Sequence, residues 1–224
     1  MRLSRFLLAL VLPVGVLAVG CATGSSAPEV DAAGLVRIDT KEPGDLFAHP
    51  ARSMDDYDNF LLGDVNVTYS SQQQPLSELD TQRLRMSTYE IVTTQIPAAG
   101  QLGVSQPGPC TVKLEVSLDD LQFPKQGSKG NGSTNVTMLF RDSLSGDQIV
   151  RYAQRRELAL GSSSGSGGPD LTRLQSTLEI VAVEMRQHFR YALPLREGTG
   201  ARADRGCKGT IGAVRKAARA AQAK

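Results

Sequence analysis

Apolar and polar residues alternate most clearly between residues 111 and 123. One side of this segment carries Val112, Leu114, Val116 and Leu118, and the other carries Lys113, Glu115 and Ser117. Strict alternation is typical of a strand with one buried face. The apolar phase resumes at Leu121 and Phe123, a slip of one position. We therefore expect a β-bulge at Asp119–Asp120.

Further strands are predicted on both sides of this segment. Residues 59–70 alternate at Val65, Val67 and Tyr69, and residues 133–142 and 149–160 are two more apolar-polar runs. The six residues between the last two runs contain a glycine, which predicts a hairpin. Residues 34–50 are interrupted by prolines and a glycine, so we expect irregular chain there, with one short strand at most.

Two segments have the spacing of amphipathic helices. Residues 75–97 place a capping pair, Ser77 and Asp80, before an apolar stripe that ends at Pro97. After a flexible linker at 161–169, residues 170–194 repeat apolar positions at three- and four-residue steps: Leu171, Leu174, Leu178, Val181, Met185, Phe189 and Ala192. The order β-α-β-β-β-α predicts an α+β two-layer sandwich, a mostly antiparallel sheet with two amphipathic helices on one face.

The N-terminus has the parts of a secretory signal peptide. Arg2 and Arg5 precede an apolar run over residues 6–19, which is shorter than the roughly 20 residues of a transmembrane helix. Ala18-Val19-Gly20-Cys21 resembles the lipobox of bacterial lipoproteins. The resemblance implies cleavage after residue 20 and attachment of acyl chains, such as palmitate, to Cys21. Ala22, in place of an aspartate, favours the outer membrane. An ordinary signal peptide that ends near a cysteine is the alternative.

Cysteine usage gives a second prediction. With Cys21 assigned to lipid, Cys110 and Cys207 remain. An even pair in an oxidising compartment is a candidate disulfide, and two unpaired thiols are the alternative. We divide the chain into a signal peptide at 1–20, a lipidated tether at 21–33, a single domain at 34–195 and a basic, alanine-rich tail at 196–224.

The tail is the one strongly charged segment. From residue 198 onward it has seven basic residues and one acid, and an alanine-rich stretch near its end favours helix. An isolated helix of about 13 residues is marginal in water, so we expect it to fray until it binds. Four residues are candidates for contact with anionic lipid or cell wall: Arg215, Lys216, Arg219 and Lys224. A disordered, solvated terminus is the alternative.

Chemical motifs are few. The histidines are His49 and His188, which are too few for a zinc site beside the assigned cysteines. The acids of residues 54–60 lack the spacing of a calcium loop and predict a solvated loop. Asp119 and Asp120 could serve a carboxylate-based enzyme only if the bulge brought them together. We expect no catalytic set, no metal, no cofactor and no nucleic-acid partner.

Several stretches suggest a family: "GLVRID", "MDDYDNFLLGDVNV", "VKLEVSLDDLQF" and "RDSLSGDQIVRYAQRR" occur in this order before a final amphipathic helix. Together they resemble proteobacterial lipoproteins of a domain-of-unknown-function family, number three-three-one-three, over roughly residues 33–194. The layout is also similar to penicillin-binding-protein activator and curli-secretion lipoproteins. The resemblance implies no catalytic residues.

We therefore expect a non-enzymatic outer-membrane lipoprotein on the periplasmic side, an accessory or scaffold protein of the cell envelope with an envelope protein as partner. A regulator of a cell-wall synthase is the first alternative. A carboxylate-based enzyme is the second.

Overall fold

The computed structural model describes residues 28–96, 103–123, 132–158, 171–195 and 205–223. The predicted signal peptide, Cys21 and Lys224 lie outside these ranges, as does the linker at 161–169.

Two short strands and a 3-10 turn come first along the chain, and the longer strands and the helices follow. The strands are β1 (Val36–Ile38), β2 (Asp45–Ala48), β3 (Asn59–Tyr69), β4 (Thr111–Gln122), β5 (Gly132–Asp142) and β6 (Gln148–Leu158). The helices are α1 (Glu78–Gln95), α2 (Leu171–Gln187) and α3 (Thr210–Gln222), with a 3-10 turn η1 (Met54–Asp56) and a π-helical stretch η2 (His188–Ala192).

The six strands form one mixed sheet in the order β1-β2-β6-β5-β4-β3. β3 and β4 are parallel and joined by α1, while every other neighbouring pair is antiparallel. The predicted α+β class is confirmed. The sequence indicated one short strand at most before β3, but there are two. Strands of three and four residues are too short for alternation to show.

Local features of the sequence reappear at their predicted positions. The register of β4 against β5 shifts between Asp119 and Gln122, and Asp120 has a φ of 54°, so the expected bulge is present. The Ser77 hydroxyl accepts a hydrogen bond from the amide of Asp80 at 3.1 Å, which caps α1 as predicted.

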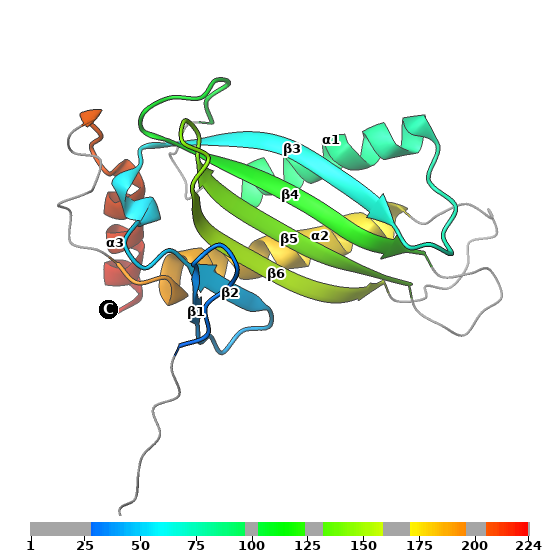
Figure 1. Ribbon diagram of the computed structural model, residues 1–224, viewed down its shortest axis with the longest axis horizontal. Coiled ribbons are helices and arrows are strands. Elements are labelled where there is room, and N and C mark those ends of the chain that lie inside the picture. The colour runs from blue at the N-terminus through cyan, green and yellow to red at the C-terminus, as the bar shows by residue number, and fades with distance from the viewer. Residues whose placement is uncertain (1–27, 97–102, 124–131, 159–170, 196–204, 224) are drawn as a thin grey trace, which may run out of the picture.

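The core lies between the sheet and its helices. Figure 1 shows α1 and α2 behind the sheet, on the same side. Val112, Leu114, Val116 and Leu118 of β4 are buried in the core, while the intervening residues are only half-buried. At one end Phe60, Phe140 and Phe189 pack together with ring centroids 5.9–6.5 Å apart. Of the helices within these residues, none has the length and apolar character that a membrane span requires.

Candidate functional site

The C-terminal helix α3 is part of the domain. It lies at one end of the sheet and packs on η1 and η2 (Figure 1). Ile211 is fully buried, and its amide donates to the carbonyl of Tyr57 at 3.0 Å. The helix that the sequence predicted is therefore present, but it packs on the rest of its own domain and not on an external surface. The expectation of a fraying or solvated terminus is wrong for residues 205–223.

Arg215 is the largest buried side chain of the molecule's described part, with 1% of its surface exposed. One Nη atom donates to Asp55, and the other donates to the carbonyl of Leu193 at 2.6 Å. Burial lowers the pKa of Arg215, and the Asp55 carboxylate opposes this shift. Arg215 therefore cannot contact an anionic surface. That expectation is wrong because the guanidinium group is buried in an ion pair with Asp55, which lies 160 positions earlier in the chain.

The other basic residues of the tail differ in accessibility. Arg219 donates from Nε to the carbonyl of Arg190 at 2.6 Å and from Nη2 to that of Leu193 at 2.5 Å. It thus occupies carbonyls at the end of η2, as basic side chains do at helix C-termini. Lys216 is exposed, so it alone of the four candidates keeps an open position among the described residues.

The acidic segment before β3 holds the start of α3. Asp58 accepts hydrogen bonds from the amides of Lys208 and Thr210, at 3.0 and 2.9 Å, and from the Thr210 hydroxyl at 2.9 Å. Burial alone would raise the pKa of Asp58, but these hydrogen bonds outweigh it and lower the pKa. Asp55 and Asp56 are only 7% and 8% exposed. The predicted solvated loop is instead a buried anchor for the C-terminal helix.

A disulfide joins Cys110 to Cys207, with the sulfurs 2.12 Å apart. The bond lies between the start of β4 and the start of α3, and it closes a loop over a sequence separation of 97. Asp58 lies close to both sulfurs. Because the sulfurs are bonded to each other, they are not the thiolates that a metal ion requires.

Asp119, Asp120 and His49 are the remaining candidates for chemistry. Asp119 accepts a hydrogen bond from the Thr68 hydroxyl at 3.1 Å, and Asp120 is exposed. Neither residue lines the pocket beside β3 or the pocket beside α3. His49 accepts hydrogen bonds at Nδ1 from the amides of Ala51 and Arg52, so this nitrogen already has backbone partners.

A polar cluster that the sequence pattern did not indicate lies between β6 and α2. His188 is 1% exposed, with Nε2 3.2 Å from the carbonyl of Pro43 and its ring 5.2 Å from that of Tyr152. The Tyr152 hydroxyl donates to Gln154 at 2.7 Å, and Arg156 pairs with Glu184. Burial, with Glu184 nearby, raises the pKa of Tyr152 far above its usual 10.0. The cluster joins the sheet to α2. The sequence feature that could have indicated it is the run of polar residues at alternate positions on the buried side of β6.

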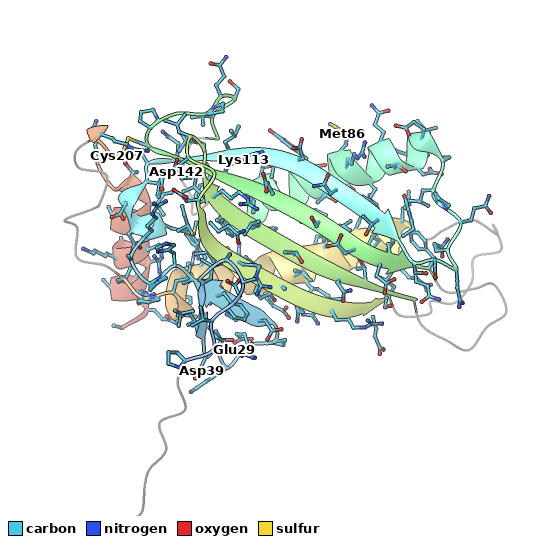
Figure 2. The ribbon with its side chains drawn as sticks, in the orientation of Figure 1. Glu29, Asp39, Met86, Lys113, Asp142 and Cys207 are labelled. Carbon is cyan, nitrogen blue, oxygen red and sulfur yellow. A yellow bond between two sulfur atoms is a disulfide. The ribbon has the colours of Figure 1, made fainter. Side chains whose placement is uncertain are left out.

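An open pocket lies at the β3 edge of the sheet, and we call it the β3 pocket. Its volume is about 210 Å³, and it is lined by Phe60, Leu61, Leu62, Tyr89, Val92, Thr93, Ile96, Gly103, Val104, Ser105 and Leu114. No charged side chain is among them. Beside it, α1 exposes half of Tyr89 and 63% of Met86. Figure 2 shows Met86 standing on α1 beyond the β3 edge of the sheet.

Neither the protein-family models nor the curated proteins match the chain. Among solved structures it is similar to a PelC dodecamer from Paraburkholderia phytofirmans, at 14% identity and a TM-score of 0.37 over 63% of this chain and 96% of that one. A DUF330-family protein of Xanthomonas campestris gives 12% identity and a TM-score of 0.37, over 62% and 87%.

A third similar structure is a homologue of neuraminyllactose-binding hemagglutinin from Helicobacter pylori. It gives 7% identity and a TM-score of 0.38 over 75% of this chain and 92% of that one. One of the three thus belongs to a domain-of-unknown-function family, but the numbered family that the sequence resembles is not confirmed. TM-scores this low say nothing about what the chain does.

Proposed function

We propose that the chain is a lipoprotein of the outer membrane, facing the periplasm, that acts as a non-enzymatic accessory or scaffold protein of the cell envelope. The observation that carries the proposal is the lipobox-like junction at Cys21. We also infer that the sheet and the two long helices make a two-layer sandwich. In this proposal the sandwich is a rigid body on a short tether.

The disulfide supports the proposed location in the periplasm. Bonds of this kind form and persist in oxidising environments such as the bacterial periplasm, and are rare in the cytosol. Cys110–Cys207 also fixes α3, which places its N-terminus beside the acidic anchor at Asp58. Such a disulfide suits a domain that binds a partner protein through a surface of fixed shape. A surface that is ordered before binding lowers the entropic cost of binding.

The β3 pocket is the best candidate for the partner's docking site. An uncharged, apolar hollow beside an exposed tyrosine and methionine fits an aromatic or aliphatic side chain of another protein. The sheet order places β3 at the edge opposite β1, where the described chain begins. Five strand spacings of about 4.8 Å separate the two edges. A tether that leaves from the β1 side would thus leave the β3 edge open to a periplasmic partner.

In-cell photocrosslinking tests this part of the proposal. A photoreactive amino acid in place of Thr93, an exposed residue of the pocket wall, should yield adducts with an envelope protein. The matched control is the same replacement at Ser176, an exposed position of α2 far along the chain from the pocket. Equal adducts at both positions, or none at Thr93, would reject docking at this pocket.

A further inference from the structure

A second pocket lies where β1 and β2 meet η1 and α3, and we call it the α3 pocket. Its volume is about 180 Å³. Its lining is mainly apolar: Val36, Ile38, Ala48, Pro50, Met54, Val150, Leu193 and Pro194. Four polar residues complete it: His49, Arg52, Ser53 and Arg215. The pocket therefore combines an apolar lining with a few polar groups, as is typical of small-molecule binding sites.

The charge of this lining has one sign. Two guanidinium groups, Arg52 and Arg215, reach the pocket, and no carboxylate is among the lining residues. Arg215 is 1% exposed, and its Nε has no hydrogen-bond partner among the described residues. Arg52 pairs with Asp147 at the surface, and one third of its side chain remains exposed. Each guanidinium already has a carboxylate partner, Asp55 for Arg215 and Asp147 for Arg52, so a negative group that entered the pocket would share two paired arginines.

The position of the pocket is also informative. Its wall includes Val36, which pairs with Val30 across an isolated bridge. From Cys21 to Val30 the chain can extend at most about 30 Å, at roughly 3.5 Å per residue. If Cys21 carries lipid, the α3 pocket therefore stays within reach of the membrane surface. This step rests on the proposed anchor, but the chemistry of the pocket does not.

We propose that the α3 pocket binds a single-chain amphiphile with an anionic head group. The apolar chain lies against Val36, Ala48 and Val150, and the head group lies beside Arg52 at the open side. On the buried side, the Nε of Arg215 supplies a hydrogen-bond donor that its ion pair with Asp55 leaves unused. Carboxylate and phosphate head groups share this chemistry, so a fatty acid and a single-chain phospholipid are the two possible sources.

Binding can be measured on the full chain carrying Cys21→Ser, purified from the periplasm with its disulfide intact and without detergent. Titration calorimetry with decanoate and with decyl phosphate separates the two sources, and decanol is the uncharged control. We expect at least one anion to bind about tenfold more tightly than decanol, because hydrogen bonds to charged groups give such factors. Equal affinities for all three, or no binding, would overturn the proposal.

Variants locate the ligand. Arg52→Gln should weaken binding of the anion about tenfold, whereas Arg37→Gln should not. Arg37 lies on β1 between two pocket residues but is exposed and paired with Glu29 and Asp45. Ala48→Phe should fill the α3 pocket and abolish binding, while Thr93→Phe in the β3 pocket should leave it unchanged. If Thr93→Phe blocks binding and Ala48→Phe does not, the ligand occupies the β3 pocket and the proposal fails.

The binding measurement and the lipidation measurement test different proposals. If the Cys21→Ser protein binds the amphiphile but the wild-type protein is not lipidated, the proposed function fails and the ligand of the α3 pocket stands. If the wild-type protein is lipidated but the Cys21→Ser protein binds neither anion, the ligand proposal fails and the proposed function stands.

Discussion

Arg215 and Asp55 form a buried ion pair that joins the last helix to the turn before β3. The two side chains are 1% and 5% exposed. Charges removed from water in this way are tolerated only as a pair. The pair therefore ties the position of Arg215 to Asp55, while the disulfide and the hydrogen bonds of Asp58 hold the start of the same helix.

Loss of one partner of this pair should be costly. We expect Asp55→Ala to lower the free energy of unfolding by about 3–5 kcal/mol, because Arg215 would keep its buried charge without its carboxylate. Urea unfolding monitored by circular dichroism measures this. The control is Asp64→Ala, since Asp64 is 83% exposed and 3.9 Å from Lys113. A loss no larger than that of the control would contradict a buried pair.

Gly212 gives a second test of how α3 packs. A Cβ at this position would lie 2.9 Å from the Cβ of Asp55 and 3.1 Å from its carbonyl oxygen. A solvated helix would gain about 1 kcal/mol from Gly→Ala. The packed helix should instead lose stability with Gly212→Ala, in the same unfolding assay. The control is Ala217→Gly on the exposed side, which should cost about 1 kcal/mol. Stabilisation by Gly212→Ala would mean that α3 does not pack as described.

The disulfide should contribute substantially to stability. A closed loop of about a hundred residues corresponds to roughly 4–5 kcal/mol in the chain-entropy model. We expect the double variant Cys110→Ser, Cys207→Ser to lose stability of this order in urea unfolding. Thiol titration of the denatured, unreduced Cys21→Ser chain should find no free thiol. Two titratable thiols in that sample would show that the bond does not form.

Asp58 predicts a pH dependence. Its folded-state pKa lies below the ordinary 3.8, so it binds fewer protons when folded than when unfolded. Its contribution is therefore complete above about pH 5 and is lost as the pH falls through the folded pKa. The difference in unfolding free energy between the parent and Asp58→Asn should shrink as the pH falls from about 5 to about 2. A difference that stays constant over this range would contradict the role of the carboxylate.

Local patterns of the sequence predicted local structure well. The bulge at Asp120, the cap at Ser77 and the apolar stripe of α2 each depend on neighbours within a few residues. The burial of Arg215 could not be predicted in this way, because its partner lies 160 positions earlier. The α3 pocket was missed for the same reason. It combines residues of β1, β2, η1 and α3 whose proximity is a property of the folded chain.

The most direct test of the proposed function is the fate of Cys21. We expect the wild-type protein to incorporate a labelled fatty acid and to fractionate with the outer membrane. Cys21→Ser should incorporate no label and should appear in the soluble periplasmic fraction, with Cys110→Ser, Cys207→Ser as a control that keeps the label. A Cys21→Ser protein that still fractionates with the outer membrane would contradict the lipid anchor.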